Sequence, residues 1–295
     1  MIGILFLSLI LISNKLICQN DFSDQQIKST YHECFTKAKE IYFTSPDSIF
    51  IIDSLIQVAL AESVTPLSTD LYFLLKVFAY RCDEKNFCNV ASQLINNGVS
   101  RVDIIKIRPS CISKRKIKTF LKQKINTNNN QNVVLKETLD QIQRDDKYSQ
   151  FFLVSNKKRE QINNNNFEKI RIIVKQLNKW PGISVTGRDQ NINHRDISDG
   201  FVHSLLHFTT DQIEFLLPFL EDALKNNDIS PYHYARIFDY YYIKKTTIAT
   251  MGRKPEQYYG IYRSRNGKSV FPVNMDRVKK RRVAICLSAD FINFD

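Results

Sequence analysis

The residues best suited to chemistry surround His207 in the second half of the chain. Asp211 follows His207 by four residues, so on one helix the two side chains would share a face, and the carboxylate would raise the basicity of the imidazole. This pattern suits a general base. His203 lies four residues before His207, a spacing that can hold a metal, but a third ligand would have to come from Asp199 or His194. Because the pattern is not specific, the sequence favours a packing histidine and predicts neither a metal site nor a cofactor.

A second polar group lies on or beside a predicted β-hairpin and the last predicted helix. Its members are Arg253, Gln257, Tyr259, Arg263 and Arg282. Guanidinium groups bind carboxylate or phosphate at two points, and the Gln and Tyr side chains could orient such an anionic ligand. The alternative is a buried polar network that pins the hairpin to the helices. The sequence favours this network.

Signatures of known catalytic classes are missing. The chain has no Gly-x-x-x-x-Gly-Lys-[Ser/Thr], no His-Glu-x-x-His and no Gly-x-Ser-x-Gly string. Its 6 cysteines show neither a Cys-x-x-Cys pair nor a Cys/His metal spacing. Cys82 and Cys88 could close a small disulfide loop, but scattered cysteines are more often small core residues. We therefore expect no disulfide scaffold, and an enzyme is not the favoured hypothesis.

Helices must position these side chains. The 8 glycines argue against a doubly wound α/β enzyme, and apolar residues recur with a helical period in most segments. The fold class is therefore predicted to be mainly α. In the second half the predicted helices cover 133–150, 167–180, 199–208, 210–224, 231–241 and 277–287. The one predicted β element is a small hairpin, in which Asn266-Gly267 turns between 257–262 and 269–273.

The first half has the pattern of paired helices. Its predicted helices cover 31–42, 49–60, 71–80 and 87–94. Successive pairs recur within the range of tetratricopeptide-like units, although the full signature of that repeat is absent. Such hairpins usually present a concave groove to a protein partner. The alternative is a helical bundle that buries the second half.

Residues 101–124 are strongly basic, with nine Lys or Arg residues and a single acidic residue, Asp103. Isoleucine, phenylalanine and leucine residues interleave with the basic ones. This composition suits contact with an anionic surface. The sequence favours the alternative, a solvated helix face whose apolar side lies in the core.

The first residues predict export. Met1 to Ile12 form an apolar run, followed by a short polar stretch, which is typical of a signal peptide cleaved just after Cys18. An uncleaved membrane anchor at 2–18 and a lipidated Cys18 are the alternatives. The net charge is +12, which outside the cytoplasm suits anionic glycans, lipid head groups or proteins rather than nucleic acid. An AT-rich genome would explain part of the Lys excess.

These observations predict four regions. They are a signal peptide at 1–18, a helical-hairpin region at 19–125, an Asn-rich linker at 126–132 and a C-terminal helical domain with the β-hairpin at 133–295. The low-complexity run of asparagines places the boundary.

Several strings in the second half, in order, resemble a family of uncharacterised bacterial domains of unknown function. They are Trp180-Pro181-Gly182 with Gly187, Leu206-His207, Tyr234-Ala235 with Asp239, Gly252 to Gly260, and Arg281-Arg282. The resemblance covers about half the chain, roughly 140–290, and brings no activity to transfer. It adds Asp239 to the candidate polar set. Where the family has Gln and Arg, this chain has Leu206 and Tyr240, so that set lacks several members.

The leading hypothesis is a non-enzymatic interaction protein, secreted or in the cell envelope, that binds a protein partner through its helical hairpins. One alternative is a hydrolase-like enzyme. It would use His207 as general base, with Asp239 as a second catalytic candidate and Arg282 or Arg253 holding an anionic substrate. The other is electrostatic adhesion to anionic surfaces through 101–124.

Overall fold

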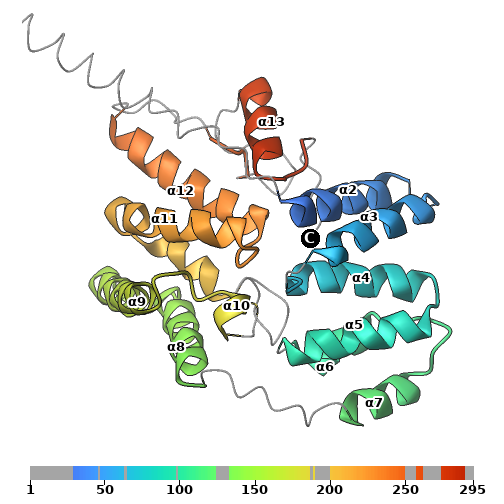
Figure 1. Cartoon of the computed structure of the whole chain (residues 1–295). Coiled ribbons are helices and arrows are strands. Elements are labelled where there is room, and N and C mark those ends of the chain that lie inside the picture. The colour runs from blue at the N-terminus through green and yellow to red at the C-terminus, as the bar shows by residue number, and fades with distance from the viewer. Residues whose placement is uncertain are drawn as a thin grey trace, which may run out of the picture.

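A computed structural model describes most of the chain. The described residues are 29–45, 47–62, 65–97, 99–123, 133–186, 189, 200–249, 257–261 and 274–289. Within these ranges every regular element is a helix (Figure 1), which confirms the mainly α prediction. The predicted signal peptide and Asn-rich linker lie outside the described residues. None of the helices described is long and apolar enough to cross a bilayer.

Helical hairpins make up the first half. The pairs are α2 (Thr30–Thr44) with α3 (Ile49–Ala61), α4 (Ser68–Tyr80) with α5 (Glu84–Asn96), and α6 (Arg101–Lys106) with α7 (Lys114–Gln123). Side-chain caps set the starts of α2 and α5, since Ser29 accepts from the N–H of His32 and Asp83 from that of Asn86. Each cap satisfies a backbone donor that the first turn of a helix leaves open.

The first two hairpins stack through their first helices. The buried hydroxyl of Tyr31 in α2 donates to Asp70 of α4 at 2.8 Å, and Lys39 reaches the other oxygen of the same carboxylate at 2.6 Å. The rings of Tyr42 and Phe73 meet edge to face, with centroids 5.4 Å apart. These contacts join α2 to α4 over one continuous apolar core.

The second half is built from longer helices and short irregular segments. Its elements are α8 (Val133–Ser149), α9 (Asn156–Leu177), α10 (Ile183–Thr186), the 3-10 helix η1 (Phe201–His207), α11 (Thr210–Lys225), α12 (Pro231–Ala249) and α13 (Met275–Ala284). Trp180 is buried in this core, and its ring stacks on that of Phe201 with the centroids 5.5 Å apart. Gly182 is required beside it, because a Cβ there would lie 2.3 Å from the Cβ of Asp228.

The predicted β-hairpin is not seen. Gln257 to Ile261 forms bends rather than a strand, and 262–273, which would hold the turn and the second strand, lie outside the described residues. The physical reason is that the N–H groups of Tyr259 and Ile261 bond to the buried carboxylate of Asp239 instead of to a partner strand.

The buried apolar residues form two clusters, one on each side of the Asn-rich segment. The two halves lie side by side, with α2 to α5 on one side of Figure 1 and α8 to α12 on the other. Hydrogen bonds cross between them. Thr36 of α2 donates to the carbonyl of Cys286 at 2.6 Å, and the N–H of Ser68 donates to Asp189 at 2.6 Å.

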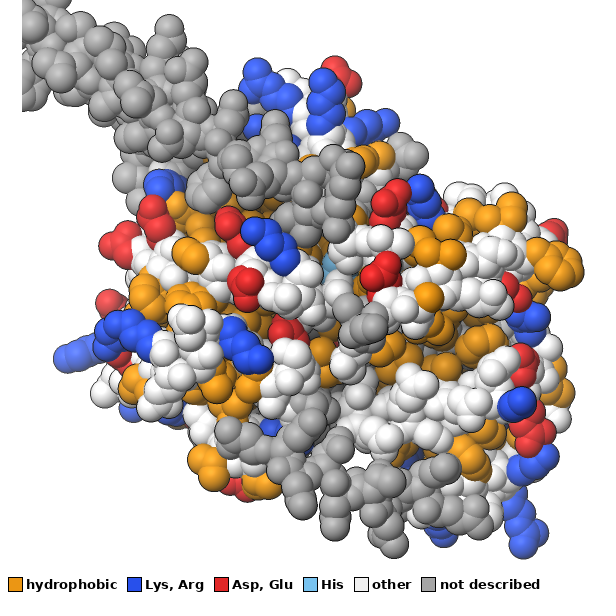
Figure 2. Space-filling model, in the orientation of Figure 1, with side chains coloured by type: hydrophobic (Ala, Val, Ile, Leu, Met, Phe, Trp, Pro, Cys, Tyr) orange, Lys and Arg blue, Asp and Glu red, His pale blue; other side chains and the backbone are white. Residues whose placement is uncertain are grey.

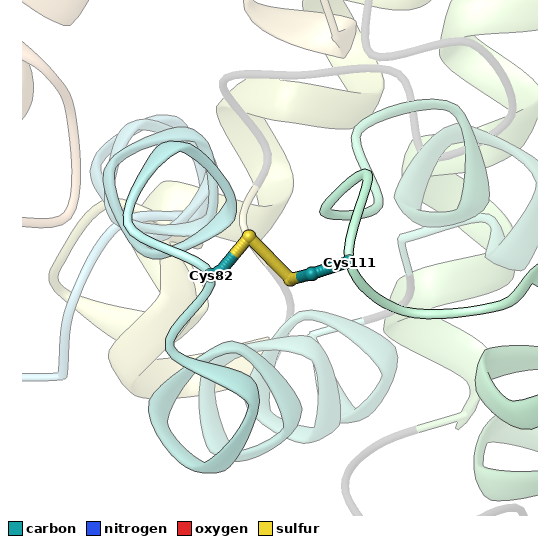
Figure 3. The surroundings of a disulfide bond; sticks show 2 residues. All are labelled: Cys82 and Cys111. Atoms are coloured by element: carbon teal, nitrogen blue, oxygen red, sulfur yellow. A yellow bond between two sulfur atoms is a disulfide. The ribbon is translucent and has the colours of Figure 1, made fainter.

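A disulfide joins Cys82 to Cys111 (Figure 3). It ties the turn between α4 and α5 to the loop between α6 and α7, so it fastens the third hairpin to the second. The suggested pairing of Cys82 with Cys88 is wrong. Cys88 lies within α5, where its side chain packs against the first core and its thiol is free.

We predict that reduction of the Cys82–Cys111 bond lowers the free energy of unfolding by about 3 kcal/mol, because the bond constrains the unfolded chain over a sequence separation of 29 residues. Urea denaturation with and without reductant measures this loss. The Cys88→Ser variant is the matched control and should show the same response to reductant as the parent. Identical midpoints with and without reductant in the parent would contradict the prediction.

Candidate functional site

His207 ends the 3-10 helix η1 and meets a carboxylate that the sequence did not identify. Its Nε2 lies 3.7 Å from Oδ1 of Asp146 in α8. The predicted partner was wrong, since Asp211 is exposed on α11 and its carboxylate accepts from Thr210. The reason is local. The helix stops at His207, the backbone of Phe208 is extended, and a new helix begins at Thr210, so His207 and Asp211 never share a helix face.

Polar atoms gather around this pair. The ring of His203 meets that of His207 edge to face at 5.8 Å, and the amide of Asn163 in α9 donates to the carbonyl of His207. Among the described residues, neither Asp146 Oδ1 nor His207 Nε2 has a hydrogen-bond partner, and the same holds for Oδ1 of Asn163. Each of these atoms can accept a hydrogen bond, so the cluster suits a small donor such as water.

Burial sets the charges of the cluster. It raises the pKa of Asp146 to about 6, against the opposing effects of His203 and Lys147. The pKa of His207 is lowered to about 4, first by burial and then by the charges of His203, Lys244 and Arg159. At neutral pH the imidazole of His207 is therefore uncharged and can accept a proton. A base with so low a pKa drives proton transfer weakly near neutral pH.

A shallow cavity of about 200 Å³ opens at His207. It is lined by Asn156, Arg159, Glu160, Asn163, Asn164, His207, Thr209 and Gln212. The side chain of His207 is 26% exposed here, whereas that of Asp146 lies beneath the surface. Half of the lining residues carry amides, and Arg159 supplies the one guanidinium among them. Within the described part of the chain no group of three His, Cys, Asp or Glu side chains could hold a metal, and His194 and Asp199 lie outside it.

The other predicted site residues come together elsewhere, in the interior. Asp239 of α12 accepts from the N–H of Tyr259 at 2.6 Å and from that of Ile261 at 2.8 Å. Arg282 of α13 donates to the carbonyls of Tyr259 and Ser288. All of these side chains except that of Ile261 are buried.

Gln257 is also buried, so all four of these predicted site residues lie in the interior rather than at an open cleft. Burial raises the pKa of Asp239 to about 6, against the backbone N–H donors and the charge of Arg282. Because the guanidinium of Arg282 is committed to carbonyl oxygens, it is not placed to hold an anionic substrate. Arg253 and Arg263 lie outside the described residues.

The structure therefore separates the predicted set into two places. His207 faces α8 and α9 beside a cavity, whereas Asp239 of α12 and Arg282 of α13 hold the segment 257–261, which contains the buried Gln257 and Tyr259. Sequence reasoning missed Asp146, Arg159 and Asn163. The signal that could have found them is the run of polar residues at helical spacing on α9, whose buried member Asn166 bonds to the carbonyl of Ile142.

Comparison with known proteins found no family model, no curated protein and no solved structure that matches this chain. The resemblance of roughly 140–290 to an uncharacterised bacterial family stays a prediction.

We predict that Asp239→Ala lowers the free energy of unfolding by about 3–5 kcal/mol, because it leaves two backbone N–H groups and Arg282 without their buried acceptor. Urea denaturation measures the loss. The exposed Asp211→Ala variant is the control and should change stability little. A fully stable Asp239→Ala protein would restore Asp239 as a candidate for catalysis.

A second prediction concerns pH. Folding raises the pKa of Asp146 from 3.8 to about 6, so the stability it contributes is fully present below pH 3.8 and is lost as the pH rises through 6. Asp146→Asn cannot titrate. Between pH 4 and pH 7 the free energy of unfolding of the variant should therefore rise relative to that of the parent by about 2–3 kcal/mol, because one pKa unit corresponds to about 1.36 kcal/mol. Denaturation curves across this range measure the gap, and parallel pH profiles would contradict it.

Proposed function

We propose that this chain is an exported, non-enzymatic interaction protein that binds a protein partner through α3. The observation that carries the proposal is the apolar outer side of this helix. Phe50 is 82% exposed, and Ile51, Val58 and Leu60 are exposed as well. Figure 2 shows hydrophobic side chains at the surface over the helices of the first half.

The composition of α3 is unusual for a surface helix. Ile52, Ile56 and Ala59 already supply the face that packs into the core. A surface helix normally carries polar residues on its other face, and a helix that is apolar on all sides is normally buried. α5 follows the normal pattern, with Phe87 and Leu94 inward and mostly polar residues outward. The outer face of α3 therefore has the character of an interface.

The position of α3 supports the same partner class. In stacked hairpins the first helices line the concave side, but here that side faces the second half of the same chain. Ser29 at the start of α2 donates to Asn227, and the N–H of Ser68 at the start of α4 donates to Asp189. The outer helix α3 remains for a partner. Its one charged residue, Asp53, is paired with Arg81, so the matching surface should be apolar.

Two features support export. The apolar run at 2–12 has the length of a signal-peptide core, and disulfides such as Cys82–Cys111 persist mainly in oxidising compartments. Secretion or release into a periplasm after cleavage is the favoured location, and an anchor at 2–18 is the alternative.

The basic segment 101–124 is better explained as the end of the stack than as a binding site. Ile117 and Leu121 of α7 are buried, whereas Lys118 and Lys122 are exposed, which is the pattern of a solvated helix. Lys116 is also engaged, in an ion pair with Glu84 of α5.

The cavity at His207 supports a second candidate, a hydrolase-like enzyme. In its favour, an uncharged imidazole lies beside a buried carboxylate at an opening to solvent. Against it, the predicted anion-holding group Arg282 lies in a different buried network. Turnover by the purified protein that is lost in His207→Ala, with no reproducible partner, would reverse the order of the two candidates.

We predict that Phe50→Ser combined with Val58→Ser abolishes partner capture. Both side chains are exposed, so the variant should fold with little change in stability while losing apolar contact area. Immobilised parent and variant proteins would be incubated with envelope extract, and the retained proteins quantified by mass spectrometry. The expected result is a partner that the parent retains and the variant loses by about tenfold.

The matched control is Phe152→Ser, which removes an equally exposed aromatic side chain from the other half of the chain. It should retain the partner. Equal loss in both variants would show non-specific adhesion and would contradict the assignment to α3.

A further inference from the structure

The turn between α8 and α9 carries three consecutive exposed apolar side chains. Phe152 is 80% exposed, Leu153 is 72% exposed, and Phe151 beside them is exposed and in ring contact with Phe152 at 4.8 Å. We propose that this α8–α9 tip, residues 150–153, inserts into the surface of an anionic lipid bilayer. This inference is independent of the protein partner proposed for α3.

The tip is held rigid in its exposed form. The guanidinium of Arg159 donates to the carbonyl of Ser149 at 2.8 Å and to that of Val154 at 3.4 Å, so one side chain bridges both ends of the turn. The N–H of Val154 also bonds to the carbonyl of Phe151, which places Phe152 at the apex of a tight turn.

The base of the turn is anchored in the protein. Val154 is buried, and the buried Ser149 donates to the carbonyl of Asp146. Because both ends are fixed, the apolar side chains between them cannot fold back onto the core. A surface that is already ordered pays little conformational entropy on binding.

Cations outnumber anions beside the tip in the sequence, where Asp145, Asp146 and Glu160 border the basic stretch. Residues 147–159 contain Lys147, Lys157, Lys158 and Arg159 and no acidic residue. The three lysines are exposed; Lys147 lies four residues before Phe151, and Lys157 and Lys158 lie four and five residues after Leu153. Each lysine near an anionic membrane contributes about 1 kcal/mol of attraction, which falls off within a Debye length. These lysines therefore complement a negative membrane surface.

The arrangement fits a bilayer better than a protein. Aromatic and leucine side chains that enter the interface, with lysines that reach back to the head groups, are the pattern of interfacial membrane anchors. Tyr148, also exposed, adds an aromatic ring with a polar end that suits this depth. A stable protein interface needs about 800 Å² on each partner, which a four-residue turn does not offer. By contrast, α3 contains no lysine.

The experiment is vesicle co-sedimentation of residues 19–295, the protein that remains after the proposed cleavage behind Cys18. Vesicles of phosphatidylcholine and phosphatidylglycerol in equal parts are compared with vesicles of phosphatidylcholine alone. We expect binding to the mixed vesicles only, and a loss of at least about tenfold in the Phe152→Ser, Leu153→Ser double variant. Raising the ionic strength from about 0.1 M to 1 M should weaken binding, since the Debye length falls from about 10 Å to 3 Å.

The matched control is Phe50→Ser on α3, which should bind vesicles as the parent does. Lys157→Glu with Lys158→Glu should lose binding to the mixed vesicles while keeping the parent's thermal midpoint, because both side chains are exposed. Equal binding by the parent and the tip variant, or binding that ignores phosphatidylglycerol, would overturn the proposal. So would dimerisation through the tip in place of vesicle binding.

Discussion

Buried carboxylates that accept hydrogen bonds from distant segments hold the irregular parts of this helical chain in place. A carboxylate loses its hydration on burial, and N–H or O–H donors must replace the water. Asp189 accepts from the N–H of Ser68 and so joins the two halves, whereas Asp239 accepts from Tyr259 and so fixes 257–261. Asp228 does the same for the short helix α10. Each of these segments lacks the length or periodicity to hold itself by helix packing.

This constraint also decides which polar residues remain for function. Residues that satisfy one another in the interior cannot bind a ligand without breaking the fold, which applies to Asp239 and Arg282. The pair of His207 and Asp146 differs, because it lies beside a cavity and its facing atoms are not hydrogen-bonded to one another. The interior therefore explains Asp239 and Arg282, whereas the polar cavity at His207 and the exposed apolar side chains remain open to solvent.

The sequence predicts what is local and misses what depends on contacts through space. Pro231 opens α12 as expected, because proline at the first helical position is a local signal. The partner of His207 could not be predicted, since η1 ends at that residue and the carboxylate comes from α8. The pairing of Cys82 with Cys111 rather than Cys88 has the same origin, because it depends on how the hairpins stack. The asparagines before Phe167 look like a loop, yet they belong to α9, whose buried Asn166 finds a carbonyl partner on α8.

The two exposed apolar surfaces differ in their charge, and this difference separates their modes of binding. α3 carries a single charged residue, Asp53, already neutralised by Arg81, so contact there is driven by apolar area and responds weakly to salt. Beside the α8–α9 tip exposed lysines outnumber exposed acidic residues, so the proposed attraction to an anionic surface should weaken as salt is added. α3 and the tip belong to different halves of the chain, and hydrogen bonds such as that from Thr36 to Cys286 join these halves. A ligand on either surface would therefore leave the helices that support the other surface in place.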